Sequence, residues 1–278
     1  MYSLLLLGYL VIPSAEVQWQ NDYESAWRKA VSEKKDLFIY FSQDNHALDN
    51  AWRDDEVRQK LNQMVCLKVP VDYVYEGQKL ITRPVFSEMS GKSGFAIMCL
   101  CDQNHACYRE LISAHPFMSS HYSWAPKTYG LNELKIVLNL SRKLTLSQRS
   151  MLFALSVHPV QPKSILGSWN DAFMNHASSH SKKQANMQYQ HHADLIGAIN
   201  RMGSQMGIGL NNGSEVVAES WGAVLGGENV LEACYSCIDA WSHSPGHWGA
   251  VCRHHRYFGY DIAKGANGTW YATGIFAD

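Results

Sequence analysis

Two short runs near the C-terminus carry side chains that could do chemistry. Glu215–Trp221 holds two carboxylates, and Trp241–Trp248 holds the imidazole of His247. Imidazole nitrogens and a carboxylate are competent ligands for a divalent cation such as zinc, with water in the open position. The same groups could act as general acids and bases near neutral pH. The two runs therefore predict a site, provided that the chain between them folds back.

The segments around these runs could supply that fold. The residues that join the two runs have a helical pattern, and Tyr257–Lys264 and Thr269–Phe276 then alternate as strands do. An Asn267-Gly268 pair lies between these strands and predicts a hairpin. Because side chains alternate along a strand, Glu215 and Glu219 are expected to face the same side of theirs.

We expect the run Ser244-Pro245-Gly246-His247 to form a loop. With the hairpin after it, this run resembles the CAP superfamily of cysteine-rich secretory, antigen 5 and pathogenesis-related proteins. The hairpin residues that carry the likeness are Phe258-Gly259-Tyr260-Asp261-Ile262-Ala263-Lys264 and Gly268-Thr269-Trp270-Tyr271-Ala272-Thr273. The resemblance covers roughly the last half of the chain. It implies an α-β-α sandwich over residues 144–278, with a cleft that binds a lipid, a sterol, a polysaccharide or a divalent metal.

In that family, two histidines and acidic residues line the cleft. By resemblance, His247 is the last of these, Glu219 is the acidic member, and the first is His191 or His192, with His192 favoured. The usual second acidic residue is missing around Trp241, and Glu215 could substitute for it. The resemblance thus implies a ligand-binding set of His191, His192, Glu215, Glu219 and His247. The metal set, which would also be the catalytic set of an enzyme, is His192, Glu219 and His247.

The same residues could instead form a buried cluster that stabilises the fold, because a hydrogen bond to a charged group contributes about 1.5–3 kcal/mol. No nucleophile with an obvious base and orienting group is evident. The leading hypothesis is therefore a non-catalytic binding protein for a small ligand or an envelope component. A metal-assisted hydrolase that uses the cleft and a structural envelope module are the alternatives.

Four other histidines are expected outside the site. His176 and His180 lie one turn apart in a helical segment over Trp169–Met187, where such a pair could bind a metal. We expect this pair on the solvated surface of the helix. His254 and His255, just before the hairpin, are expected in an exposed turn.

Composition and charge narrow the class of protein. The 278 residues are 46% hydrophobic and carry a net charge of −1, so a sizeable core is possible and no basic excess suggests nucleic acid. The apolar run in Met1–Ala15 is too short to span a bilayer and predicts a secretory signal peptide over residues 1–15. A hydrophobic first strand or a membrane-anchored N-terminus is the alternative. We therefore expect a secreted, envelope or periplasmic protein whose mature chain has no membrane span.

Residues 16–143 alternate helical and strand patterns, which indicates an α/β layer fold, so that the whole chain is expected to be α/β and α+β. Leu37–Phe41 is a continuous apolar run typical of a strand buried on both faces, and helical patterns follow at Leu48–Asn62 and Gln78–Met89. The order resembles a thioredoxin-like domain. The stretch Ser42–Asp49, where active members carry CxxC, has no cysteine, and thiol exchange needs thiols. The resemblance therefore implies a redox-inactive module that ends near Lys143.

Seven cysteines are an odd number for an exported chain. Cys234 and Cys237 form a CxxC inside a helical pattern, with no second pair at zinc-finger spacing. We interpret them as small buried hydrophobic residues. A disulfide from either of them to Cys252 is the next alternative, ahead of a metal or redox site.

Overall fold

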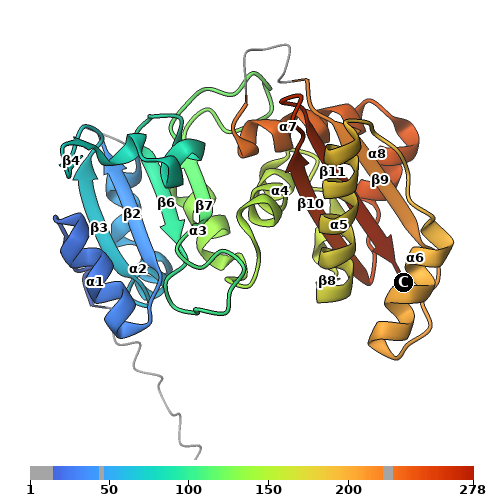
Figure 1. Ribbon diagram of the computed structural model, residues 1–278, viewed down its shortest axis with the longest axis horizontal. Helices are drawn as coiled ribbons and strands as arrows, with labels where there is room; N and C mark the ends of the chain where they lie inside the picture. The colour runs from blue at the N-terminus through green and yellow to red at the C-terminus, as the bar shows by residue number, and fades with distance from the viewer. Residues whose placement is uncertain (1–14, 44–46, 222–227) are drawn as a thin grey trace, which may run out of the picture.

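The computed structural model describes residues 15–43, 47–221 and 228–278. The predicted signal peptide lies outside these residues, apart from Ala15. The described chain builds two large sheets, one from strands within residues 19–116 and one from strands within residues 168–277, with helices packed on both (Figure 1). The protein is therefore a mixed α/β and α+β structure, as the sequence predicts.

The first sheet is mixed and five-stranded, and the apolar run Leu37–Phe41 lies at its centre as predicted. The strand order is β1 (Trp19–Gln20), β3 (Val65–Pro70), β2 (Leu37–Ser42), β6 (Gly94–Met98) and β7 (Leu111–Pro116). Strand β2 runs parallel to β3 and antiparallel to β6. Phe38 and Tyr40 enter one hydrophobic cluster and Ile39 and Phe41 the other, so both faces of β2 are buried. Helix α1 (Tyr23–Glu33) packs on one face, and α2 (Asp55–Leu61) and α3 (Leu131–Asn139) pack on the other.

Two predicted helices in this part are wrong. The helix expected over Leu48–Asn62 is divided into the 3₁₀ helix η1 (Ala47–Arg53) and α2, because the Asp54 side chain caps a new helix start. The region Gln78–Met89 is not an α-helix. A short hairpin of β4 (Val74–Tyr75) and β5 (Gln78–Lys79) is followed by the 3₁₀ helices η2 (Leu80–Thr82) and η3 (Pro84–Met89). Pro84 holds the preceding Arg83 in the extended region, which stops a continuous helix.

Helix α4 (Leu146–Val157) lies between the two sheets (Figure 1). It begins at a capping box in which Thr145 and Gln148 bond each other's backbone N–H groups. Its side chains share one hydrophobic cluster with Phe38 of the first sheet and Phe276 of the second. Its burial extends to the polar side chains of Gln148, Arg149 and Ser150, as its position between two sheets requires. The predicted boundary at Lys143 falls in the turn between α3 and α4.

The second sheet has the order β8 (Ser168–Trp169), β10 (Tyr257–Lys264), β11 (Trp270–Ala277) and β9 (Ser214–Glu219). The predicted hairpin is confirmed, since β10 and β11 pair antiparallel along their full lengths. Helix α5 (Asp171–Met187) crosses one face so closely that a Cβ on Gly259 would lie 2.3 Å from the Phe173 carbonyl.

The remaining helices surround this sheet. Helix α6 (Leu195–Met206) packs beside α5, and α4 and α7 (Val230–Ser242) cover the opposite face. Helix α8 (Pro245–Cys252) lies beside β9, and the 3₁₀ helix η4 (Lys163–Leu166) precedes β8. The sheet is thus held between helices on both faces.

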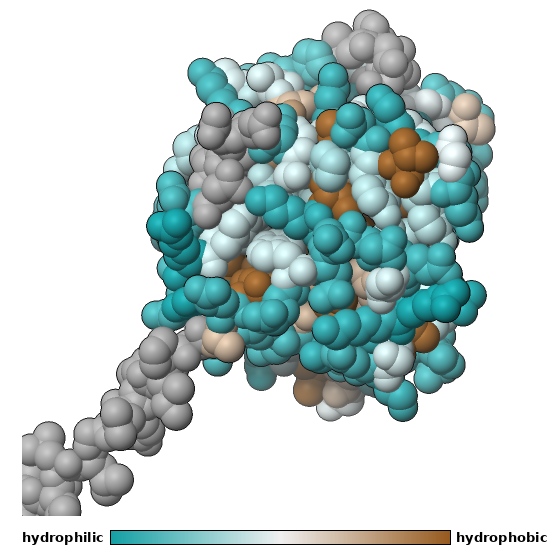
Figure 2. Space-filling view, turned by 90° about the vertical axis from the view of Figure 1, so that its left-hand side faces the viewer, coloured by the Kyte–Doolittle hydropathy of each residue, from teal (hydrophilic) through white to brown (hydrophobic). Residues whose placement is uncertain are grey.

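The surface and the cysteines complete the description. Hydrophilic residues cover most of the face in Figure 2, with hydrophobic residues in scattered spots. Among the described residues, no helix is both long and apolar enough to cross a membrane. All seven cysteines lie within the described part and are unpaired. Cys234 and Cys237 are completely buried, as expected for small hydrophobic residues, and neither is bonded to Cys252.

Candidate functional site

Glu215 is the centre of a histidine cluster on the α5 side of the second sheet. Its neighbour Val216 points into the core on the other face, so the alternation of β9 turns Glu215 toward α5. Only 2% of the Glu215 side chain is exposed. A buried carboxylate is costly unless positive or hydrogen-bonding groups surround it. The two oxygens of Glu215 meet this requirement with different partners.

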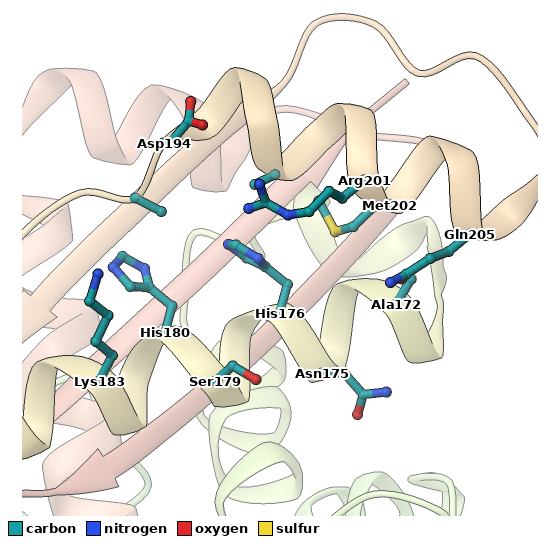
Figure 3. A pocket seen from close by; sticks show the side chains of 12 residues that line it. Ala172, Asn175, His176, Ser179, His180, Lys183, Asp194, Arg201, Met202 and Gln205 are labelled. Carbon is teal, nitrogen blue, oxygen red and sulfur yellow. The ribbon is translucent and has the colours of Figure 1, made fainter.

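The Oε1 atom faces the two histidines of α5. The Nδ1 atom of His180 lies 3.0 Å from Oε1, and the Nε2 atom of His176 lies 3.9 Å from it. Residues four apart on a helix share one face, which is why both rings reach the same carboxylate. Figure 3 shows the two rings projecting from α5 toward α6.

The Oε2 atom faces the loop between α5 and α6. The backbone N–H of Ala193 donates to Oε2 at 2.8 Å, and the Nδ1 atom of His192 lies 3.0 Å from it. The ring of His247, from the first turn of α8, has its centroid 5.7 Å from the centroid of the His192 ring. The loop therefore contacts this oxygen directly, and α8 lies next to the loop through His247.

The loop that carries His191 and His192 is fixed to the sheet. The backbone N–H of His191 donates to Oε1 of Gln184, and Nε2 of Gln184 donates to Oγ1 of Thr273 on β11. The His191 ring packs edge-on against the His180 ring, with centroids 5.0 Å apart. These two hydrogen bonds and the ring contact hold the histidines of the loop next to those of the helix.

The electrostatics of the cluster favour an ionised Glu215 and a neutral His247. Burial by itself would raise the pKa of Glu215, but the nearby imidazoles of His176 and His180 and the Ala193 N–H hold that pKa well below its ordinary value. Burial lowers the pKa of His247, and the neighbouring His192 lowers it further. A neutral imidazole keeps the lone pair that a metal ion needs.

Five buried atoms of the cluster residues lack a hydrogen-bond partner among the described residues. Three of them lie together, namely Nε2 of His176, Nδ1 of His180 and Oε1 of Glu215, and the other two are Nε2 of His180 and Nε2 of His191. The His180–Glu215 pair is close, but it lacks the in-line geometry of a hydrogen bond. Buried polar atoms without partners are rare in folded proteins, so three at one point require an explanation.

A divalent cation fits these three atoms. One ligand atom from each of His176, His180 and Glu215 lies within 4.8 Å of the other two. Tetrahedral zinc with ligands at about 2.0–2.1 Å places its ligand atoms about 3.3 Å apart. Here Oε1 of Glu215 lies 3.0 Å from Nδ1 of His180 and 3.9 Å from Nε2 of His176. Two imidazoles and a carboxylate are also a donor set that zinc accepts. His176, His180 and Glu215 are therefore the residues that could hold such a cation.

The histidines of α5 open onto a pocket of about 480 Å³ between α5 and α6. Asn175, His176, His180 and Lys183 line it from α5, and Arg201 and Gln205 line it from α6 (Figure 3). Glu215 does not line the pocket, whereas the two imidazoles beside it do, so a cation at the three atoms would sit in the pocket wall.

The structure brings some of the sequence-predicted residues together and separates one of them. His192, Glu215 and His247 converge, and His191 joins them through His180. Glu219 is the exposed last residue of β9, where it pairs with Tyr271. Four residues of strand span about 13 Å, and no contact found within the described chain links Glu219 to the histidines.

Three expectations from the sequence are corrected by the structure. His176 and His180 are not a solvated pair, because His180 is buried and both rings face Glu215. His255 is fully buried, with its ring stacked on Phe276 at 4.6 Å, instead of lying in an exposed turn. The run that begins at Ser244 is not a loop, since Pro245 starts α8. A signal for His180 was available, since it shares the apolar side of its helix with Phe173 and Ala177.

No family model and no curated protein matches this sequence. One solved structure that resembles it is an outer surface protein from Borrelia burgdorferi, with 18% identity and a TM-score of 0.31 over 40% of this chain and 77% of that chain. Another is an extracellular protein containing a SCP domain from Bacillus anthracis str. Ames, with 15% identity and a TM-score of 0.30 over 49% of this chain and 44% of that chain. At these TM-scores the likenesses decide neither the family nor the function of this chain.

Proposed function

We propose that this chain is a secreted or envelope-associated binding protein that holds a divalent cation, with zinc as the best fit, at His176, His180 and Glu215. The observation that carries the proposal is the convergence of three buried ligand atoms without hydrogen-bond partners in the described chain. His192 and His247 stand on the other side of the same carboxylate, where the Nδ1 atom of His192 orients Oε2. Such outer partners of a metal-binding carboxylate fix its position and affinity.

A binding role fits the site better than hydrolysis. Two histidines and a glutamate also form the ligand set of some zinc hydrolases, whose H-E-x-x-H helix places the general base next to the first histidine. In this chain the residue after His176 is Ala177, which is fully buried and has no group that could act as a general base. The hydrolase alternative with His192, Glu219 and His247 would need Glu219 to approach the other two residues.

The CAP-like and thioredoxin-like assignments remain part of the proposal. The sheet of residues 144–278 lies between helices, which supports the α-β-α sandwich that the Ser244–His247 run suggested. The central buried strand β2 supports a thioredoxin-like module in residues 16–143, and the lack of cysteine in Ser42–Asp49 supports its redox inactivity. Export rests on the predicted signal peptide.

The test is a calorimetric zinc titration of the full chain and three variants. We expect one zinc per wild-type chain, loss of binding in His180→Ala, and unchanged binding in His254→Ala, whose side chain is exposed and outside the cluster. His247→Ala should keep the zinc with reduced affinity. Loss in His247→Ala with retention in His180→Ala would assign the cation to His192 and His247 and contradict the proposed ligands. Absence of binding throughout would leave the cluster with a structural role.

A further inference from the structure

The pocket beside the proposed cation is lined by more positive than negative charge. Lys183 enters it from α5 and Arg201 from α6, and neither forms an ion pair with any residue that the structure describes. Asp194 also lines the pocket, but its carboxylate caps α6 by accepting from the Gly197 N–H. With a divalent cation against Glu215, the pocket and its wall would carry an excess of two positive charges.

The side chains place these charges on opposite walls of the same space. Figure 3 shows Arg201 reaching back from α6 over the space that His176 enters, while Lys183 stands on α5 next to His180. Asn175 and Gln205 add amide groups near the other end of the pocket. The volume of about 480 Å³ lies in the range of sites for small molecules.

We infer that this pocket binds the phosphate group of a small phosphorylated ligand, a conclusion that rests on the proposed cation. Three protein ligands leave the fourth position of a tetrahedral cation open, and one phosphate oxygen would take it. The other oxygens would meet the guanidinium of Arg201, whose fork matches phosphate, and the ammonium of Lys183. A phosphate monoester offers three terminal oxygens to these three positive groups, whereas a carboxylate offers two, so phosphate is the better match.

The full chain loaded with cobalt(II) tests this inference, because the visible spectrum of cobalt responds to a change in its ligands. Methylphosphonate serves as the probe, and acetate is the comparison anion. We expect methylphosphonate to change the spectrum of the wild-type protein at lower concentration than acetate. In Arg201→Met, the affinity for methylphosphonate should fall tenfold or more, with cobalt affinity unchanged.

Lys183→Met and Lys182→Met form a matched pair of variants. Both remove one positive charge from α5, but Lys182 does not line the pocket and instead interacts with Asp261. Weaker methylphosphonate binding is expected in Lys183→Met alone. Bound cobalt with no response to methylphosphonate, equal affinity in wild type and Arg201→Met, or equal binding of acetate would each overturn the phosphate site while the cation site stands. Failure to bind cobalt would overturn both.

Discussion

Replacing His180 with alanine should abolish the stabilisation that zinc gives to the folded protein. His180 supplies Nδ1 at 3.0 Å from the Oε1 atom of Glu215, and it is the most buried of the three proposed ligand residues after Glu215. The alanine variant keeps only His176 and Glu215, and two ligands do not make a structural zinc site. The difference between melting temperatures with and without zinc should therefore disappear.

The size of the effect follows from binding linkage. A ligand present at 100 times its dissociation constant, and bound by the native state alone, stabilises that state by about 2.7 kcal/mol. A change of 1 kcal/mol shifts the melting temperature by about 2–4 °C in proteins of 150–250 residues. Zinc should thus raise the melting temperature of the wild type by about 5–11 °C, and that of His180→Ala by less than about 2 °C.

The assay is scanning calorimetry of each variant with zinc and with a chelator. Each variant is compared with itself, so any cavity left by the shorter side chain lowers both melting temperatures and cancels in the difference. His254→Ala is the matched control and should keep the full zinc shift. A shift of wild-type size in His180→Ala would refute the assignment of His180 as a ligand, whatever the stability of its apo form.

Three further predictions concern the charge of Glu215, the buried Arg149 and the redox activity of the full chain. The pKa of Glu215 in the folded protein lies below its ordinary value of 4.5. The charge of this carboxylate therefore stabilises the folded protein fully above pH 4.5, and that stabilisation is lost as the pH falls below 4.5 and through the pKa of the folded protein. The stability difference between wild type and Glu215→Gln in urea should accordingly shrink from pH 6 to pH 3, and a constant difference would contradict this linkage. Arg149→Met should cost about 1–3 kcal/mol in urea unfolding, because it would leave buried acceptors without their donor. Buried Arg149 donates to Ser113 Oγ and to the carbonyls of Val137, Leu140 and Ser141 at the C-terminal end of α3, and a cost below about 1 kcal/mol would count against this role. The full chain should not accelerate the reduction of insulin by dithiothreitol, and turnover there would contradict a redox-inactive first domain.

Local signals in the sequence predicted the strands around the site well. The Asn267-Gly268 pair fixes a turn within a few residues, and the hairpin that it predicts is present with Tyr257 opposite Ala277. The apolar run Leu37–Phe41 is also predicted from local sequence alone, because a continuous apolar run indicates a strand buried on both faces, and this strand is buried on both. Such features need no knowledge of distant contacts.

Helices without a strong start or end signal were predicted less well. Gln78–Met89 carries apolar residues at helical spacing, yet Pro84 divides it into 3₁₀ turns that still bury Leu80 and Phe86. The apolar side chains reach the core either way, so their spacing did not distinguish the two conformations. The Ser244–His247 run shows the reverse error, because Pro245 is favourable in the first turn of a helix.

The choice between Glu215 and Glu219 depends on information that lies outside β9. Alternation places both side chains toward α5, and the local sequence does not say which one α5 covers. The register with β11 decides it, because Glu215 is opposite Ile275, near the α5 core, and Glu219 is opposite Tyr271 at the exposed end of the strand. A contact between strands far apart in sequence thus selects the carboxylate.

The same dependence on distant contacts explains why the two histidines of α5 were expected on the surface of the helix. It also explains what they contribute to the fold. An ionised Glu215 whose side chain is 2% exposed needs polar or positive partners, and the apolar side chain of Ile275, opposite it on β11, supplies none. His176 and His180 reach Oε1 from the helix, while His192 and Ala193 reach Oε2 from the loop, so one carboxylate joins α5, the loop and β9. A cation at Oε1 would strengthen only the helix side of this junction. Zinc should therefore protect the α5 amides around His176 and His180 from hydrogen exchange more than those of α3, and equal protection of both helices would place the cation elsewhere.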